Sequence, residues 1–189
     1  MAFPYPLKMK KAMIELGLSQ KIIDKSDPFV SRDFMQEQVI PFINQMDKLL
    51  SPEQCLSIME RQGCCKTGKS DIANRNFGLE HVGKSIEEKI KLLSKAEIPY
   101  SVPCELNKNG TLTVFWGSGE EGNYKCVCYG IKKLSESVKI PQTYCGCCGG
   151  HVRYHLQNAL GVNLRLKEIV SSAKDSNGKN RCEFLFEID

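Results

Sequence analysis

Residues 100–116 read YSVPCELNKNGTLTVFW, and this stretch decides the fold. Two strand-like runs, Tyr100 to Leu106 and Thr111 to Trp116, flank an Asn-Gly step that supplies the positive φ angles of a tight hairpin. Similar patterns predict three more strands, over residues 124–129, 162–173 and 181–188. We therefore expect a mostly antiparallel sheet of four to five strands.

The half of the chain before this hairpin has the three- and four-residue apolar spacing of amphipathic helices. One long helix is predicted from about residue 27 to residue 50, with a kink at Pro41. Capping boxes at Ser51–Gln54 and Ser85–Glu88 predict two further helix starts. A later helix, within 144–160, ends at a glycine. The fold class is therefore α+β, with helices covering the sheet.

The composition is that of one globular domain. With 189 residues, 41% of them hydrophobic and 25% charged, the chain can bury a core and lacks the bias of a disordered segment. We predict a single domain over 1–189, with a helical layer at about 1–96 and a sheet and cysteine-rich layer at about 97–189. Because the 26 basic residues are interleaved with 22 acidic ones, we expect no nucleic-acid partner.

Export and membrane signals are not found in the sequence. Residues 1–6 lack the basic start of a signal peptide, and no segment reaches the ~18 consecutive apolar residues of a membrane span. The expected location is the cytoplasm. Ten cysteines in such a chain, with adjacent pairs at 64–65 and 147–148, favour reduced thiols or thiolate ligands over a disulfide framework.

The strongest chemical motif is YCGCCGGH at residues 144–151, followed by a second histidine. Its thiols and imidazoles are those of Cys145, Cys147, Cys148, His151 and His155. Glycines let the backbone bend so that the thiols present sulfur toward one point, and a helix starting near Gly149 places both imidazoles on one face. Such ligands favour zinc over iron. The alternative is that all five are packed core residues.

The remaining cysteines give weaker signals. Cys126 and Cys128 alternate along a predicted strand, so we expect their sulfurs on opposite faces, with one of them reaching the motif. The pair 64–65 lies on a loop where neighbouring lysines would lower the thiol pKa if close, and a plain loop pair is equally consistent. Cys55 and Cys104 are predicted to be packing residues.

Residues 63–70, GCCKTGKS, match the Walker A pattern. A phosphate-binding loop follows a buried strand, so that backbone amides and the next helix N-terminus converge on phosphate. Here a capped helix precedes the segment, and no apolar strand ending in Asp follows to hold magnesium. The favoured interpretation is a helix-ending glycine and a basic loop, and nucleotide binding is the weaker one.

The C-terminal part of the chain resembles a known family. A helix ending at Gly161, a strand bearing Glu168, a polar turn and Cys182-Glu183-Phe184 follow one another. This order resembles the vinyl-4-reductase-type small-molecule-binding domain of bacteriochlorophyll biosynthesis proteins and phenol-sensing regulators. The resemblance implies a ligand pocket above a zinc ion.

The resemblance also implies zinc ligands. The matching positions are Cys145 or a neighbouring cysteine, Glu168, residue 171 and Cys182. Because residue 171 is a serine, the missing ligand would have to come from Cys147, Cys148 or His151.

Two further resemblances imply no particular substrate. Residues 58–65 and 143–189 resemble an uncharacterised family of short cysteine-rich bacterial proteins. More distantly, the clustered cysteines and the helix-strand-turn-strand ending resemble the aminothiazoline-carboxylate hydrolase family.

The favoured functional hypothesis is a small-molecule-binding protein with a cysteine-rich, zinc-binding floor. The predicted metal ligands are Cys145, Cys147, Cys148, His151, Glu168 and Cys182. Aromatic residues that could line the pocket, or else belong to the core, are Phe115, Trp116, Tyr124, Phe184 and Phe186.

Two alternatives stay open. One is a cysteine- or metal-dependent hydrolase of a small cyclic amidine or amide, with a nucleophile from 145–148 or 64–65 and His151 or His155 as base. The other is a structural zinc module for a protein partner, either another protein or a second copy of the chain.

Overall fold

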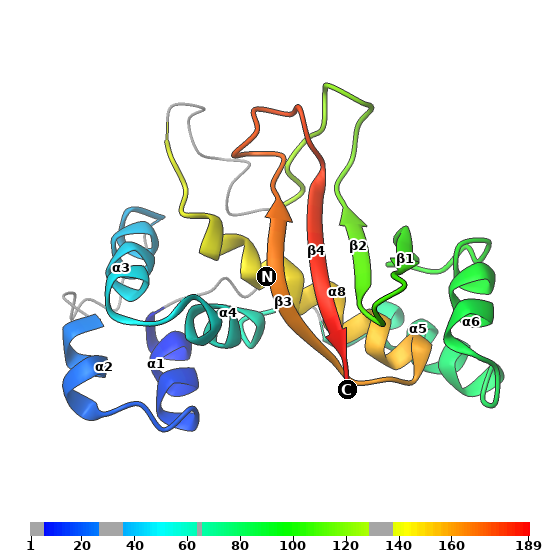
Figure 1. Ribbon diagram of the computed structural model, residues 1–189, viewed down its shortest axis with the longest axis horizontal. Helices are drawn as coiled ribbons and strands as arrows, with labels where there is room; N and C mark the ends of the chain where they lie inside the picture. The colour runs from blue at the N-terminus through cyan, green and yellow to red at the C-terminus, as the bar shows by residue number, and fades with distance from the viewer. Residues whose placement is uncertain (1–5, 27–35, 64–65, 129–137) are drawn as a thin grey trace.

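The protein combines helices with one antiparallel sheet, as a computed structural model shows for residues 6–26, 36–63, 66–128 and 138–189 (Figure 1). Its helices are α1 (Pro6–Glu15), α2 (Gln20–Ser26), α3 (Gln36–Leu49), α4 (Pro52–Glu60), α5 (Lys69–Glu80), α6 (Ile86–Leu93), the 3-10 turn η1 (Gln142–Cys145) and α8 (Gly146–Leu160). Its strands are β1 (Cys104–Leu106), β2 (Leu112–Trp116), β3 (Leu164–Ser171) and β4 (Cys182–Ile188). The predicted α+β class is confirmed. No helix within these ranges is long and apolar enough to cross a membrane.

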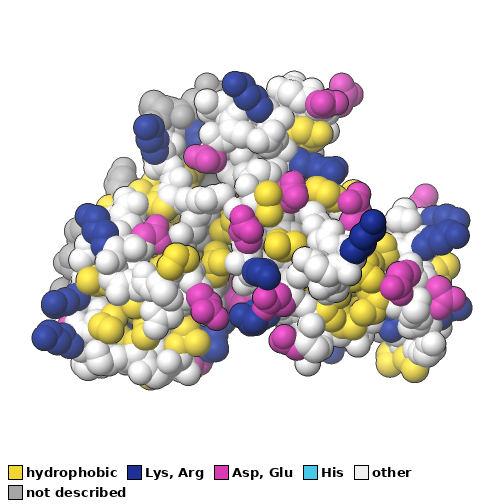
Figure 2. Space-filling view, viewed as in Figure 1, with side chains coloured by type: hydrophobic (Ala, Val, Ile, Leu, Met, Phe, Trp, Pro, Cys, Tyr) yellow, Lys and Arg dark blue, Asp and Glu magenta, His cyan; other side chains and the backbone are white. Residues whose placement is uncertain are grey.

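The sheet has the order β1-β2-β4-β3, and all neighbouring strands are antiparallel. On its buried face, Val114, Phe184 and Phe186 are fully covered, and α8 crosses this face in Figure 1. The other face carries Lys167 and Glu187, whose Nζ and Oε1 atoms lie 3.2 Å apart. Figure 2 shows acidic and basic side chains interspersed there. The sheet is therefore apolar on one side and solvated on the other.

Two of the predicted helix starts are confirmed in detail. Ser51 and Ser85 each accept a hydrogen bond at 3.2 Å from the backbone N–H three residues on. Gln54 and Glu88 accept the reciprocal bonds from the cap residues, which completes both capping boxes. Pro41 lies inside α3, as expected, and residues 27–35 of the predicted long helix lie outside the described residues.

Two hydrophobic clusters form the core. One lies between the sheet, α5, α6 and α8, and the other gathers α1 to α4 with Tyr144 and Cys147. Because Cys145 belongs to the first cluster and Cys147 to the second, the start of α8 joins them. This junction holds the cysteine motif.

Two local predictions were wrong, and one helix was not predicted. Residues 124–128 form no strand, and their one ladder contact is an isolated bridge between Ser118 and Lys125. The first strand begins at Cys104 and not at Tyr100, whose left-handed φ of 67° lies outside the strand region. The helix that was not predicted is α5, which begins at the end of the Walker-like segment and whose buried side is small. Its weak apolar stripe explains why periodicity missed it.

Candidate functional site around helix α8

The glycines of the YCGCCGGH motif lie inside α8, where they let neighbouring elements approach closely. A Cβ on Gly150 would overlap the Glu60 carbonyl of α4, and one on Gly149 would lie 2.9 Å from Leu166 Cδ2 of β3. We expected a bent backbone and a helix start near Gly149, but α8 already begins at Gly146. Because these glycines have no side chain, α4 and the sheet can pack closely against α8.

Cys128 interacts electrostatically with four other cysteines, and we call these five the thiol cluster: Cys126, Cys128, Cys145, Cys148 and Cys182. They come from the loop after β2, the start of α8 and the start of β4. Cys128 is central, because its Sγ donates to Tyr144 Oη at 4.0 Å and its side chain also hydrogen-bonds that of Cys148. All five are free thiols. The expected placement of Cys126 and Cys128 on opposite faces of a strand does not hold, because no strand forms there.

Four thiols of this cluster favour the protonated form. Burial raises the pKa of Cys126 to about 11, and it also raises the pKa of Cys145 and Cys182. The hydrogen bond with Cys128, followed by burial, raises the pKa of Cys148. A nucleophilic cysteine needs the opposite shift. These thiols are therefore poorly prepared for attack on a substrate.

The predicted metal ligands do not all meet. Cys145, Cys148 and Cys182 join the thiol cluster, whereas the Sγ of buried Cys147 donates to the Gln62 carbonyl at 3.6 Å. Glu168 is exposed and pairs with Leu185, so strand alternation places it on the face opposite Cys182. Ser171, the other position implied by the resemblance, donates to the Arg181 carbonyl at 2.6 Å.

The residues present therefore do not fit the zinc site that the resemblance implies. Within 6–26, 36–63, 66–128 and 138–189, no group of three or more His, Cys, Asp or Glu side chains is arranged to hold a metal ion. Cys64 and Cys65 lie outside the described residues. Zinc stays a prediction.

His151 and His155 lie on one face of α8, as predicted, and belong to a second group that we call the imidazole cluster. Its other members are Tyr100 and Trp116. The Tyr100 ring stacks on His155 with centroids 4.3 Å apart and meets His151 edge-on at 4.5 Å. Trp116 lies 5.9 Å from His151, and the two imidazoles are 5.0 Å apart. The rings contact one another, so this cluster is packed.

Two features of the imidazole cluster are unusual. Tyr100 is a bulky residue in the left-handed region, a conformation that persists only when the surroundings enforce it. Asn74 helps to enforce it, because its Nδ2 donates at 2.8 Å to the Pro99 carbonyl and lies 3.5 Å from His155 Nδ1. The Oδ1 of Asn74 is buried and has no partner among the described residues.

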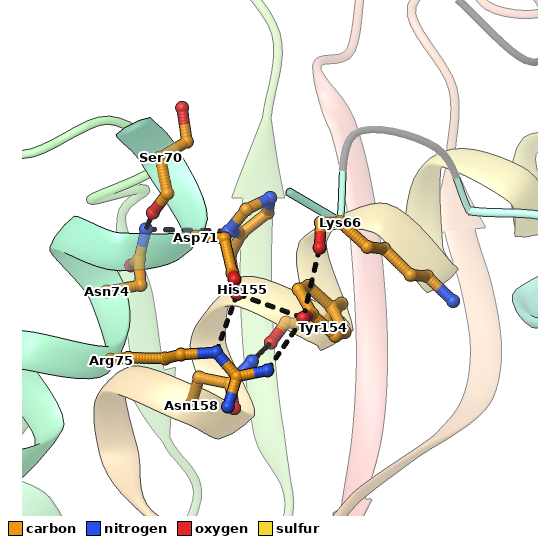
Figure 3. A network of polar contacts seen from close by, with 8 residues as sticks. All are labelled: Lys66, Ser70, Asp71, Asn74, Arg75, Tyr154, His155 and Asn158. Atoms are coloured by element: carbon orange, nitrogen blue, oxygen red, sulfur yellow. Dashed lines mark hydrogen bonds and ion pairs between the residues drawn. The ribbon is translucent and has the colours of Figure 1, made fainter. Parts of the chain in front are cut away.

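A polar network ties the Walker-like segment to α8 (Figure 3). The Tyr154 hydroxyl donates to Asp71 Oδ1 at 2.9 Å and lies 3.2 Å from the Lys66 carbonyl. It accepts from Arg75 Nη2 at 2.8 Å. Although partial burial opposes the shift, hydrogen bonds from Tyr154 and Arg75 hold the pKa of Asp71 below its usual value. The Walker-like segment follows helix α4, as expected. Lys66 within it and Asp71 just after it both contact Tyr154 of α8.

A groove of about 400 Å³ lies between α5 and α6, and we call it the α5–α6 groove. Its lining residues are Ala73, Asn76, Phe77, Glu80, His81, Leu92, Lys95, Ala96 and Ile98. His81 Nδ1 donates to the Phe77 carbonyl at 2.8 Å, which leaves Nε2 as the acceptor atom of the ring. No sequence motif marks this groove, because a hollow between two helices depends on how they pack.

The aromatic residues proposed as pocket walls lie elsewhere. Phe184 and Phe186 are fully buried core residues. The Arg181 guanidinium lies over the Phe115 ring, with its Cζ atom 3.5 Å from the ring centroid. Trp116 belongs to the imidazole cluster, and Tyr124 packs beside the core. None of the five lines the α5–α6 groove.

The two cysteines expected to serve packing are consistent with that role. Cys55 is 2% exposed, and its Sγ donates to the Met46 carbonyl at 3.7 Å. Cys104 is half-buried on β1, and burial raises its pKa to about 11.

Comparison with models of known families finds no match, and comparison with curated proteins and with solved structures finds none either. The three family resemblances therefore stay predictions, and the function is argued from the geometry.

Proposed function

We propose that this protein binds a small amphipathic molecule in the α5–α6 groove. The observation that carries the proposal is the groove itself. Its volume of about 400 Å³ falls within the range of roughly 300–1,000 Å³ that is typical of small-molecule sites.

The lining of the groove suits a ligand with an apolar body and a polar end. Ala73, Phe77, Leu92, Ala96 and Ile98 provide apolar contact area. The polar groups are Asn76, Glu80, His81 and Lys95, which offer an amide, a carboxylate, an imidazole and an ammonium group. A few polar anchors in an apolar wall are the usual composition of a ligand site.

The groove is connected to the imidazole cluster through residues 98–100. Ile98 lines the groove, the Pro99 carbonyl accepts from Asn74, and the Tyr100 ring stacks on His155. A ligand that moves Ile98 would therefore change the surroundings of Trp116, the single tryptophan of the chain. Its fluorescence reports on binding.

The hydrolase and structural-zinc hypotheses rest on weaker support. The hydrolase needs a low-pKa thiolate, whereas burial and hydrogen bonding raise the pKa of Cys145 and Cys148. The zinc module needs four donors in one shell, and the described residues offer no such group.

A fluorescent probe tests the proposal. Anilinonaphthalene sulfonate has an aromatic body and a charged end, and we expect one molecule to bind per chain and to alter Trp116 emission. Ala96→Phe fills the groove and should weaken binding at least about tenfold, since the probe and the new ring compete for the same space.

The matched control places the same ring outside the groove. Ile72 on α5 is 58% exposed and does not line the groove, so Ile72→Phe should bind the probe like the wild type. Equal binding by Ala96→Phe and wild type, with circular dichroism showing both folded, would exclude the groove as the site.

A further inference from the structure

Outside the groove, the contact between Cys128 and Cys148 is the least explained feature of the protein. The two residues belong to a loop and to α8, yet their side chains hydrogen-bond to each other. The Tyr144 hydroxyl joins them, because Cys128 Sγ donates to it at 4.0 Å. Two sulfurs and a hydroxyl group therefore meet at one point.

As whole residues, the members of this pair are less completely covered than two other members of the thiol cluster. Cys128 and Cys148 are partly exposed, whereas Cys145 and Cys182 of the same cluster are 6% and 5% exposed.

The number of donors selects the class of ion. Zinc takes four protein ligands in a closed site, and within the described residues no three His, Cys, Asp or Glu side chains are arranged to hold a metal ion. A thiophilic monovalent ion with a filled d shell is satisfied by two thiolates, and soft sulfur donors select copper(I). We propose that Cys128 and Cys148 bind one copper(I) ion as a two-thiolate complex.

The chemistry balances without an electron transfer. Each thiol releases its proton to solvent, and each sulfur forms one bond to the ion, so Cu⁺ and two thiols give an anionic bis-thiolate complex and two protons. The Tyr144 hydroxyl, which now accepts from Cys128, would rotate to donate to the thiolate.

This site goes beyond the proposed function, because neither cysteine lines the α5–α6 groove. Loss of copper binding would leave probe binding intact, and the reverse also holds. The two proposals therefore fail separately.

Competition with a chromogenic copper(I) chelator tests the site. Anaerobic protein, kept reduced by a phosphine, should withhold one copper(I) per chain from bathocuproine disulfonate. Cys128→Ser and Cys148→Ser should each weaken binding at least about 100-fold, and Tyr144→Phe about tenfold, as expected for a ligand and for a supporting hydrogen bond. Cys104→Ser removes a half-buried thiol outside the cluster and should bind like the wild type.

Three results would overturn the proposal. The wild type could withhold no copper, Cys104→Ser could lose as much affinity as Cys128→Ser, or excess zinc could displace the ion. X-ray absorption of the wild-type complex gives a check that needs no variant to fold. Two sulfur neighbours support the site, and three or more contradict it.

Discussion

The thiol cluster gathers five cysteines in contact with the core, whereas the α5–α6 groove offers about 400 Å³ of space and contains no cysteine. Burial keeps thiols of the cluster, such as those of Cys126 and Cys145, protonated. The α5–α6 groove has space for a ligand but no thiol. The sequence suggested that one site would bind both a metal ion and a small molecule. Soft-metal chemistry and small-molecule binding belong to different places on the molecule.

The two regions share a support. Helix α8 carries Cys148 at its start and contacts α5 near its end, where a Cβ on Gly78 would overlap the Asn158 carbonyl. Helix α5 in turn forms one wall of the groove. Variants of this shared support should affect both regions, and variants in one region should leave the other unchanged.

The largest effect is expected from Gly150→Ala, which forces α8 away from α4. The new Cβ would overlap the Glu60 carbonyl, so the free energy of unfolding should fall by more than about 3 kcal/mol in urea titrations. Gly17→Ala is the control, because Gly17 has open surroundings and only its φ of 72° opposes a side chain. It should lose about 1–2 kcal/mol. Equal losses would show that the helix contact is not as close as described.

Glu60→Ala should have the next largest effect, because it removes a buried partner from the support of the thiol cluster. Glu60 Oε1 pairs with Arg153 Nη1 at 2.9 Å, and its Oε2 accepts from the Leu166 N–H at 3.0 Å. We expect a loss of about 3 kcal/mol in the same titration.

Glu53→Ala is the matched control for that variant. The Glu53 carboxylate is 80% exposed and lies 3.5 Å from Arg165 Nη1, so its loss should change the free energy of unfolding by less than about 1 kcal/mol. A small effect of Glu60→Ala, similar to this control, would argue against a buried pair at α4.

The protonated state of the thiol cluster predicts slow alkylation of Cys126. Burial raises its pKa from an ordinary 9.0 to about 11, so its rate with iodoacetamide at neutral pH should be about 100-fold below that of an ordinary thiol. The rate should climb with pH up to about 11, as followed by mass spectrometry. A plateau near neutral pH would reveal a thiolate and restore the nucleophile hypothesis.

The same shift has a consequence for stability. Because the folded-state pKa of Cys126 lies above its unfolded value, this thiol stabilises the fold below pH 9.0. The contribution should be lost as the pH rises toward about 11.

The smallest effect is expected at the turn between β3 and β4. Asn177 has a φ of 50°, so Asn177→Ala should lose about 1 kcal/mol and Asn177→Gly should lose none. The neighbouring Gly178 carbonyl accepts from the Tyr124 N–H at 2.9 Å, which supports the loop that carries Cys126 and Cys128. Copper(I) binding should weaken in the alanine variant, and probe binding in the groove should not change. The reverse pattern would contradict the separation.

Local signals in the sequence predicted much of the fold. The Asn-Gly hairpin, the capping boxes at Ser51 and Ser85 and the helix ending at Gly161 all depend on a few neighbouring residues. Helix α5 was not predicted because it buries little apolar surface. The strand expected at 124–129 does not form over its described residues, 124–128, because strand pairing depends on distant partners.

The site was predicted less completely, for a physical reason. The motif at 144–151 identified Cys145 and Cys148, and the terminal strand identified Cys182, but Cys128 became central only through folding. Glu168 was placed by an expected ligand pattern, and strand alternation turns it to the other face. Which thiols meet is a matter of distances between elements, and periodicity carries no such information.

A two-dimensional amide NMR titration with both ligands tests the separation most directly. Anilinonaphthalene sulfonate should shift the amide signals of residues around Phe77, Leu92 and Ile98, and copper(I) should shift those around Cys128 and Cys148. The account predicts two sets without common members. One shared set of shifted amides for both ligands would contradict it.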